Sequence, residues 1–492
     1  MSDVSTAETI QKNMEKPEMI APLNLKNGKR YYIESYGCQM NISDSEVVAS
    51  VMNDNGYEAI DDYYQADVIF LNTCSIRDKA EQTVRNRIKQ FNRLKKEKKH
   101  LMIGILGCMA ERLKHKLLEE ERLVDLVAGP DVYRELPNMI TEVSGGQKSV
   151  NVLLSRDETY ADITPVRISS NGVTAFVSIM RGCDNMCSFC VVPYTRGRER
   201  SRSADTIIAE IKDLMSNGYK EVTLLGQNVD SYRWSADPTL KGLKLIENKY
   251  AENVLNFSRL LEMVAQISPI LRVRFSTSHP KDMSDDVIEV MAKYPNICKC
   301  IHLPVQSGSS SCLDRMNRTY DRPWYLDRIA AIRRILPECA ISSDVIAGFC
   351  GETIAEHQET LAMMEHVRYD ASFMYYYSER PGTPAAKRFV DDVPEEEKKR
   401  RLQEIVDLQN KHSLERNQEQ IGKRQIVLIE WTAKKSKEQL LGRNDANKKV
   451  IIPKGNLNLG DYIEVEIVDC NSNTLFGEVV RKIEDDELLI TN

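Results

Sequence analysis

The chain has no apolar segment long enough to cross a membrane. Its longest apolar run extends from about Leu101 to Ala110, well short of the ~20 residues that a membrane-spanning helix requires. The N-terminus carries Asp3, Glu8 and Glu15 and lacks the apolar core of a signal peptide. We therefore expect a cytoplasmic protein that is not associated with a membrane.

The sequence also has no excess of positive charge and no internal repeat. Lysine and arginine number 67 against 73 acidic residues, for a net charge of −6. The chain as a whole does not attract nucleic acid, so any RNA contact must use local basic patches. Hydrophobic residues make up 42% of the 492 residues, which indicates a globular protein of about three domains.

The first predicted domain covers residues 29–147, after a polar segment, residues 1–28, that we expect to be flexible. The predicted strands are Arg30–Tyr36, Asp67–Asn72 and Leu101–Leu106. The predicted helices are 43–53, 79–96, 109–119 and 131–143. Ser43 and Glu46 have the spacing of a capping box, so the first helix should begin there. This alternation predicts a doubly wound parallel α/β sheet of the flavodoxin-like or Rossmann-like kind.

A second domain is predicted at residues 168–411 and a third at 414–485. Strand-like runs in the second domain are 174–180, 221–225, 272–276, 300–303, 342–347 and 372–377. Six strand–helix units are too few for a complete eight-fold barrel, so a partial, open (β/α)6 barrel fits better. After a charged helical connector at about 391–418, five short strands predict a small antiparallel β-barrel.

Cysteine is plentiful, with 12 residues, and three of them form a C-x3-C-x2-C motif. Cys183, Cys187 and Cys190 follow the first strand of the second domain, and the aromatic Phe189 precedes the last of them. A structural zinc site requires four ligands. A cubane iron–sulfur cluster can take three thiolates and leave one iron open to another ligand. The motif therefore favours a reactive iron–sulfur cluster over zinc.

A second cysteine trio follows the strands of the first domain. Cys38, Cys74 and Cys108 each lie just beyond a predicted strand. Ligands of open α/β sheets bind beyond the carboxyl ends of the strands, so the three thiols should converge. Gly37 and Gly107 would let the backbone approach an inorganic ligand closely. The alternative is that these cysteines are small buried residues at strand ends.

Together these residues resemble the radical S-adenosylmethionine (SAM) methylthiotransferases, over about residues 29–485. Two runs carry the resemblance, Tyr36–Asn41 and Cys187–Arg202. The resemblance implies an N-terminal methylthiotransferase domain, a radical SAM core and a C-terminal TRAM domain that binds RNA. It implies two [4Fe-4S] clusters. Cys183, Cys187 and Cys190 would hold the cluster that binds SAM, and Cys38, Cys74 and Cys108 would hold an auxiliary cluster.

The reaction implied by the resemblance is methylthiolation of C2 of N6-isopentenyladenosine at position 37 of tRNA. One SAM would be cleaved to a 5′-deoxyadenosyl radical, a second would donate the methyl group, and the auxiliary cluster would supply sulfur. An aromatic C–H is too inert for ordinary acid–base catalysis, so cofactors must carry this chemistry. Relatives that act on threonylcarbamoyl-adenosine in tRNA, or on an aspartate of a ribosomal protein, usually differ in the two runs.

Further residues at or near strand ends are predicted to face the mouth of the partial barrel and to bind SAM. They are Phe189, Gly226, Gln227, Asn228, Ser276, Gln306, Asp344 and Ile346. Ile346 could equally belong to the hydrophobic core. His279 follows the third strand, either as a proton carrier or, more commonly, as a loop histidine with satisfied hydrogen bonds.

RNA contacts are predicted at two basic groups. The first is Arg196, Arg198, Arg200 and Arg202, beside the cluster loop; these arginines would bind phosphate or the SAM carboxylate, or else form salt bridges in a solvated turn. The second group belongs to the third domain and comprises Lys423, Arg424, Lys434 and Lys435. The aromatic run Tyr375–Tyr377 could stack on a base or fill the barrel core.

The resemblance also implies partners. They are a tRNA anticodon stem-loop carrying the isopentenylated adenosine, an electron donor such as flavodoxin or ferredoxin, and a supplier of sulfur or clusters. We expect a monomer. A different class of function, a non-catalytic iron–sulfur or zinc protein that binds RNA, is disfavoured by the missing fourth cysteine and by the residues at the barrel strand ends.

Overall fold

The computed structural model describes residues 28–75, 78–168, 170–237, 239–240, 245, 247, 251–485 and 487. They form two compact units. The first comprises residues up to Ser170 together with 180–184 and 191–202, and the second comprises 171–179, 185–190 and the chain from Ser203 onward. The expected flexible extension, residues 1–28, lies outside the described residues except for Gly28.

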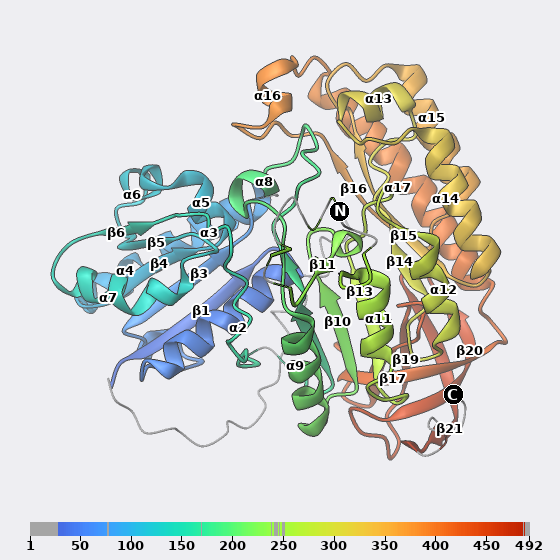
Figure 1. Ribbon diagram of the computed structural model, residues 1–492, viewed down its shortest axis with the longest axis horizontal. Helices are drawn as coiled ribbons and strands as arrows, with labels where there is room; N and C mark the ends of the chain where they lie inside the picture. The colour runs from blue at the N-terminus through green and yellow to red at the C-terminus, as the bar shows by residue number, and fades with distance from the viewer. Residues whose placement is uncertain are drawn as a thin grey trace. The chain divides into compact units, whose positions relative to one another are not determined.

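The first unit is built on a parallel sheet, shown in blue and cyan in Figure 1. Within the described residues its strands follow the order β2-β1-β3-β4-β5-β6, and every neighbouring pair is parallel. Their bounds are β1 Arg30–Tyr36, β2 Glu58–Ala59, β3 Val68–Thr73, β4 Met102–Leu106, β5 Leu126–Ala128 and β6 Ser149–Asn151. The chain leaves β1 toward β2 on one side and returns to β3 on the other, which makes the β1–β3 border a topological switch point.

Helices cover both faces of this sheet, as the doubly wound prediction requires. On one face α2 (Gln39–Asp54) and α7 (Leu136–Ser144) bury Val48, Met52 and Ile140 against Phe70. The other face is covered by α3 (Asp78–Gln90), α4 (Asn92–Glu97), α5 (Cys108–Leu113) and α6 (His115–Glu120). Short 3-10 turns occupy Tyr63–Gln65 and Tyr133–Glu135.

Two boundaries differ from the sequence prediction. Helix α2 begins at Gln39 with Cys38 as its N-cap, so the predicted capping box at Ser43 is wrong; Ser43 lies inside the helix and is buried. The tight turn at Gly37 joins β1 directly to the helix and leaves no loop for a later start. The sheet also continues to β6, beyond the expected end at residue 147, because a three-residue strand has too little periodicity to be recognised.

The second unit contains the predicted partial barrel of parallel strands. One sheet has the order β13-β10-β7 and another β14-β15-β16, and all these pairs are parallel. The bridge between Val273 and Ile297 and the hydrogen bond from Ser278 N to His302 O continue β13 into β14. The bounds are β7 Thr174–Ser178, β10 Glu221–Leu225, β13 Arg272–Ser276, β14 Cys300–His302, β15 Ala340–Ala347 and β16 Ala371–Tyr376.

A row of amphipathic helices packs outside these strands. Helix α9 contacts β7 and α11, α11 contacts α12, and α12 contacts α14 (Figure 1). The bounds are α9 Ala204–Ser216, α11 Phe257–Ala265, α12 Asp285–Lys293, α13 Ser310–Arg315, α14 Arg322–Ile335, α15 Ile354–Val367 and α16 Pro384–Arg388. Short elements complete this part of the chain: β8 Met180–Arg181, β9 Arg200–Ser201, α8 Val192–Thr195, η3 Val229–Ser231, β11 Arg233–Trp234 and β12 Leu255–Asn256.

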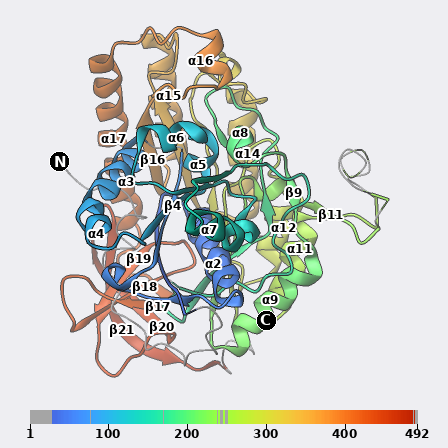
Figure 2. The same cartoon turned by 90° about the vertical axis from the view of Figure 1, so that its left-hand side faces the viewer.

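The long helix α17 (Glu395–Gln418) is the predicted connector, and it leads into a closed five-stranded barrel that lies together in red in Figure 2. The strands are β17 Arg424–Thr432, β18 Gln439–Arg443, β19 Lys449–Pro453, β20 Tyr462–Cys470 and β21 Thr474–Ile483. The predicted barrel is confirmed, but it is not wholly antiparallel, because β19 and β21 pair in parallel.

The small barrel is joined to the base of the partial barrel by buried charges. Glu221, at the start of β10, accepts hydrogen bonds from Arg274 Nε at 2.9 Å and from Arg443 Nη2 of the small barrel at 2.8 Å. Burial alone would raise the pKa of Glu221, but the two guanidinium groups hold it below its ordinary value. Tyr462 of β20 donates to Ile270 O at 3.0 Å and stacks under Arg272.

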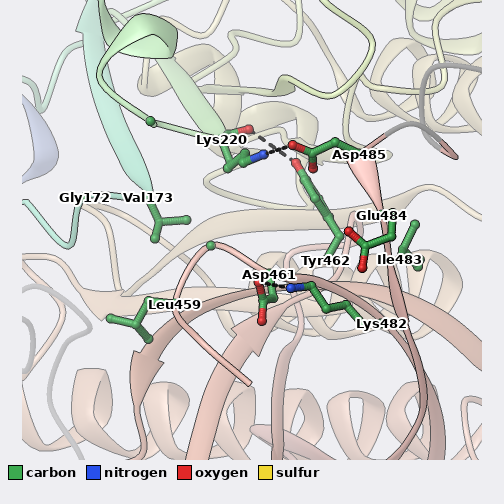
Figure 3. Close-up of a pocket in the computed structure, with 12 residues that line it drawn as sticks. Gly172, Val173, Lys220, Leu459, Asp461, Tyr462, Lys482, Ile483, Glu484 and Asp485 are labelled. Carbon is green, nitrogen blue, oxygen red and sulfur yellow. Dashed lines mark hydrogen bonds and ion pairs between the residues drawn. The ribbon is translucent and has the colours of Figure 1, made fainter. Parts of the chain in front are cut away.

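A shallow polar pocket of about 260 Å³ lies at this junction (Figure 3). Val173 and Lys220 line it from the N-terminal ends of β7 and β10, and Asp461, Lys482 and Asp485 line it from the small barrel. Lys220 pairs with Asp485, and Lys482 pairs with Asp461 at 3.0 Å. Because it lies at the strand ends opposite the predicted mouth, this pocket is not a candidate for the reaction site.

Candidate iron–sulfur and RNA-binding site

The cysteine trio of the first unit lies at the carboxyl ends of three adjacent strands. Cys38 follows β1, Cys74 follows β3 and Cys108 follows β4, and these strands are neighbours in the sheet. A Cβ atom added at Gly37 would stand 2.3 Å from Cys74 Cβ, so only glycine permits this approach. The structure therefore brings together three residues separated by more than thirty positions in the sequence.

The three thiols also interact electrostatically. The pKa of Cys38 is lowered to about 6, chiefly by its hydrogen bond with Cys74 and, against the effect of burial, by the charge of Arg196. Burial raises the pKa of Cys108, the Arg196 charge lowers it, and the Cys38 thiolate raises it further. Removing charge from one of these groups therefore changes the ionisation of the others.

Asparagine and serine side chains hold the loops of this trio in place. Cys38 Sγ donates to Asn41 Oδ1 at 3.1 Å, and Asn41 Nδ2 donates to Asn72 Oδ1 at 3.1 Å. Asn72 Nδ2 donates to Asn41 O at 2.9 Å and to Ser45 Oγ at 3.0 Å. Because Asn41 and Asn72 are fully buried, this network fixes the cysteine loops with neutral hydrogen bonds.

A buried cation lies beside the trio. Arg196 Nε donates to Cys108 Sγ at 3.2 Å, and its Nη2 donates to Asp44 Oδ2 at 2.7 Å. Asp44 also accepts from Arg181 Nη1 at 2.7 Å. The side chains of Arg196 and Asp44 are only 4% and 1% exposed. Burial alone would raise the pKa of Asp44, but Arg181 and Arg196 hold it below its ordinary value.

These contacts correct the predicted RNA contacts of the arginine run. Arg196 is occupied by Asp44 and Cys108, and Arg200 is buried with both Nη2 bonds on Asp131, at 2.9 and 3.0 Å. A guanidinium paired inside the protein does not face a phosphate backbone. Arg202 is also buried. Arg198 is the exception, because its side chain is 72% exposed and pairs with Asp184 at 2.7 Å, and its RNA contact stays a prediction.

The residues around the trio fit a bound iron–sulfur cluster. Thiolates are the ligands of such clusters, and Gly37 lets the Cys38 loop approach Cys74 closely. Arg196 Nη1 is buried and has no hydrogen-bond partner among the described residues. Within the same residues, no group of three His, Cys, Asp or Glu side chains is arranged to hold a single metal ion.

The C-x3-C-x2-C loop spans the division between the two units. Cys183 belongs to the first unit, where its N–H donates to Gly197 O at 3.2 Å, and Cys187 and Cys190 belong to the second. Cys187 is buried and accepts a hydrogen bond from Arg318 Nη1 at 3.2 Å. Arg318 is held in turn by Tyr320 and by Pro304 O, each at 2.9 Å. No local sequence pattern pointed to Arg318.

The predicted SAM-binding residues occupy the carboxyl end of the partial barrel. Gly226, Gln227 and Asn228 follow β10, and Ser276 ends β13. Gln306 has a positive φ of 72° and pairs with β15 through its backbone, while Asp344 lies on β15 with its carboxylate 3.6 Å from His302 Nε2. Phe189 and Ile346 both pack against the hydrophobic cluster around Phe349. Their contact with SAM stays a prediction.

A second set of buried polar groups lies at the same strand ends, of which the sequence had pointed to His279 but not to Asp230 and Ser278. Asp230 and Ser278 are buried, and neither oxygen of Asp230 has a hydrogen-bond partner among the described residues. Burial raises the pKa of Asp230 to about 8. His279 is buried with both ring nitrogens unpartnered in the same part of the chain, so it is not a satisfied loop histidine. Burial and the nearby Arg318 lower its pKa, which keeps it neutral.

The predicted RNA-contacting residues of the small barrel are exposed, at two separate places. Lys423 and Arg424 lie at the start of β17, and Lys434 and Lys435 follow its end. A nine-residue strand separates the pairs by about 30 Å. In the aromatic run, Tyr377 is buried against Phe349, as a core residue, while Tyr376 is exposed.

A partial barrel of six parallel strands, with a C-x3-C-x2-C loop after its first strand, defines the class of radical SAM proteins. Three family models match the chain: Uncharacterized protein family UPF0004 at residues 30–129, the Radical SAM superfamily at 177–364 and the TRAM domain at 418–480. The radical SAM methyltransferase TsrM from Kitasatospora setae has a similar fold, with a TM-score of 0.53 at 13% identity over 73% of this chain and 77% of that one.

Closer relatives share the whole architecture. The tRNA-2-methylthio-N(6)-dimethylallyladenosine synthase of Amoebophilus asiaticus is 60% identical over 92% of this chain and 93% of its own length. The proteins of that name from Flavobacterium johnsoniae and Bacteroides fragilis are each 53% identical, over 96% and 92% of this chain and 98% and 96% of their own lengths. The chain belongs to the family of tRNA-2-methylthio-N(6)-dimethylallyladenosine synthases.

Proposed function

We propose that this protein is a tRNA methylthiotransferase that converts N6-isopentenyladenosine at position 37 to its 2-methylthio derivative. The observation that carries the proposal is the combination of two cysteine trios, one in the radical SAM loop and one at the switch point of the first sheet, in a chain 60% identical to a synthase named for that product. Dimethylallyl and isopentenyl denote the same N6 substituent.

The two trios have different tasks in this proposal. Cys183, Cys187 and Cys190 hold the [4Fe-4S] cluster that binds SAM, and Cys38, Cys74 and Cys108 hold the auxiliary [4Fe-4S] cluster. When bound, these cofactors supply the radical, the sulfur and the methyl group. SAM binds to Gly226, Gln227, Asn228, Ser276, Gln306, Asp344, Phe189 and Ile346; the support is that most of them lie at or near the carboxyl ends of the barrel strands.

The substrate is tRNA, and the exposed lysines and arginines of the TRAM barrel offer phosphate contacts. An external electron donor, such as flavodoxin or ferredoxin, and a supplier of sulfur complete the reaction. The protein would act in the cytoplasm as a monomer. Within the described residues, no helix is both long and apolar enough to cross a membrane.

The test uses three anticodon stem-loops that differ only at position 37: isopentenylated adenosine, threonylcarbamoyl-adenosine and unmodified adenosine. The anaerobically reconstituted protein is incubated with reductant, SAM and each stem-loop, and the nucleosides are analysed by mass spectrometry. We expect a methylthio product from the isopentenylated stem-loop alone. A product from threonylcarbamoyl-adenosine instead would contradict the proposed substrate and retain the reaction class.

A further inference from the structure

The strongest feature that the proposed function does not use is the buried guanidinium of Arg196. Its Nε points at Cys108 Sγ at 3.2 Å and its Nη2 at Asp44 Oδ2 at 2.7 Å. Its Nη1 is buried without a hydrogen-bond partner in the part of the chain that the structure describes. Buried donors are rarely left unpaired in native proteins, so a group that is not part of the chain would accept this hydrogen.

The surroundings restrict what that group can be. Arg196 touches one of three convergent cysteines, through Nε at 3.2 Å from Cys108 Sγ. A guanidinium N–H forms its strongest hydrogen bonds with anionic acceptors. The cluster that the trio is proposed to hold carries such anionic sulfides.

We propose that Arg196 is a positioning residue for the auxiliary cluster. Its Nε holds the Cys108 sulfur, its Nη1 donates to an anionic sulfur of the bound cluster, and Asp44 keeps the guanidinium plane in place. This inference rests on the proposed function, because it requires that Cys38, Cys74 and Cys108 bind the cluster. It replaces the RNA contact predicted for Arg196 from the sequence.

The proposed contacts of Arg196 would change the reduction potential of the auxiliary cluster. Hydrogen bonds to cluster sulfurs and nearby positive charge stabilise the reduced, more negative cluster and raise its reduction potential. Asp44 would offset part of that charge, but the Nε and Nη1 hydrogen bonds act on sulfur directly. Loss of Arg196 should therefore move the potential of the auxiliary cluster to more negative values and change its spectrum.

The experiment starts from the full chain with Cys183, Cys187 and Cys190 replaced by alanine, so that only the auxiliary cluster can bind. Into this background we introduce Arg196→Met, Arg196→Lys or the control Arg200→Met. Arg200 is equally buried in the same run, but it donates to Asp131 and to backbone oxygens of Ser155 and Glu158. Each protein is reconstituted, its iron is counted and its cluster is titrated with reductant under electron paramagnetic resonance detection.

We expect every variant to bind iron. The midpoint potential should shift to more negative values in Arg196→Met and by a smaller amount in Arg196→Lys. In Arg200→Met it should stay close to that of the parent protein. If Arg196→Met does not fold, Arg196→Lys carries the same comparison. Equal potentials in the Arg196 variants and the control would overturn this inference alone. A parent that binds no iron would overturn the auxiliary-cluster assignment, and this inference with it.

Discussion

At the scale of single residues, a buried arginine contacts each of the two cysteine trios proposed to hold a cluster. Each proposed cluster has one buried arginine whose N–H reaches a ligand sulfur: Arg196 at Cys108 and Arg318 at Cys187, both at 3.2 Å. Both arginines are fixed by further hydrogen bonds, to Asp44 in one case and to Tyr320 in the other. A buried cation held this firmly acts on the cluster as a constant charge.

Replacement of Cys74 by alanine should separate the two chemistries. The SAM-binding trio is untouched, so we expect 5′-deoxyadenosine to be formed from SAM while the methylthio product is lost. Bound iron should fall by about half, since one of two [4Fe-4S] clusters is lost. Cys312→Ala, at a buried cysteine in the hydrophobic cluster around Phe349, is the control and should retain the iron. Methylthio product from Cys74→Ala would contradict the assignment of two clusters.

Replacement of Arg318 by methionine should affect only the SAM-binding cluster. The substitution removes the hydrogen bond to Cys187 and the positive charge, and both losses destabilise the reduced cluster. The reduction potential should therefore become more negative, by about 60 mV for each tenfold change in the equilibrium constant of reduction. Potentiometry of a variant lacking the auxiliary trio measures this shift. Arg322→Met, whose guanidinium donates to backbone oxygens of Gly308 and Glu359, is the control. An unchanged potential in Arg318→Met would exclude the tuning role.

The roles of residues could be predicted from the sequence where their spacing forms a local motif, but not where burial in the folded protein determines their partners. The C-x3-C-x2-C spacing and the strand-end positions of Cys38, Cys74 and Cys108 are local patterns. The run of Arg196, Arg198, Arg200 and Arg202 looks uniformly basic, yet the structure buries Arg196 and Arg200 on Asp44 and Asp131 and leaves Arg198 exposed. Both carboxylates lie far away in the sequence, so no local pattern could reveal these pairs.

At the scale of elements, the turns that join strand to helix determine where the trio lies. Gly107, between β4 and α5, has a φ of +84°, and a Cβ there would stand 2.3 Å from Asn72 Oδ1. Asn72 is part of the network that fixes the Cys38 loop. The turn after β4 and the loop after β1 are therefore coupled through one asparagine.

Gly107→Ala tests this coupling, with Gly146→Ala as the matched control. Gly146 has a φ of +89° and no atom within 4 Å of a built Cβ, so Gly146→Ala adds only backbone strain of about 1 kcal/mol. Gly107→Ala adds a clash with a buried amide and should cost about 1–3 kcal/mol more. Urea unfolding and iron content check this: Gly107→Ala should lose both stability and auxiliary iron. Equal urea unfolding midpoints for Gly107→Ala and Gly146→Ala would show that the close approach of Gly107 to Asn72 does not contribute to stability.

The elements themselves were largely predictable because their periodicity is strong. All six barrel strands lie within a few residues of their predicted positions, since short strand-like runs that alternate with helical segments mark the strands of a β/α barrel. The predicted start of α2 was wrong because the capping-box spacing at Ser43 occurs by chance inside a helix whose N-cap residue is Cys38. The parallel pairing of β19 with β21 is a matter of topology, which strand periodicity does not encode.

At the scale of the whole chain, the second unit joins the TRAM barrel to the N-terminal end of the partial barrel, opposite the strand ends that carry the predicted SAM site. The joint depends on Glu221, which is fully buried between Arg274 and Arg443. Arg274 also donates to backbone oxygens of Asn444 and Asp445 in the small barrel. The TRAM domain is thus fixed to the partial barrel by a dense ionic contact.

Glu221→Gln should loosen this joint. It leaves the buried guanidinium of Arg274 without its carboxylate, while Arg443 keeps its ion pair with Glu430, at a cost of about 3–5 kcal/mol. Because the folded pKa of Glu221 is below its ordinary value, its stabilisation is complete above the ordinary pKa and is lost as the pH falls through the folded pKa. Hydrogen exchange of β17–β21 at neutral pH should therefore accelerate in Glu221→Gln. The exposed Glu466→Gln is the control; equal exchange in the two variants would contradict the role of Glu221.

The most direct test of the account asks whether the sulfur of the product comes from the cluster of the first unit. The protein is reconstituted anaerobically with ³⁴S-sulfide and freed of excess sulfide. It is then given reductant, SAM and the isopentenylated stem-loop for a single turnover. We predict a methylthio nucleoside heavier by the isotope difference, and no product from a protein in which Cys38, Cys74 and Cys108 are alanine. An unlabelled product, or product from the triple variant, would contradict the account.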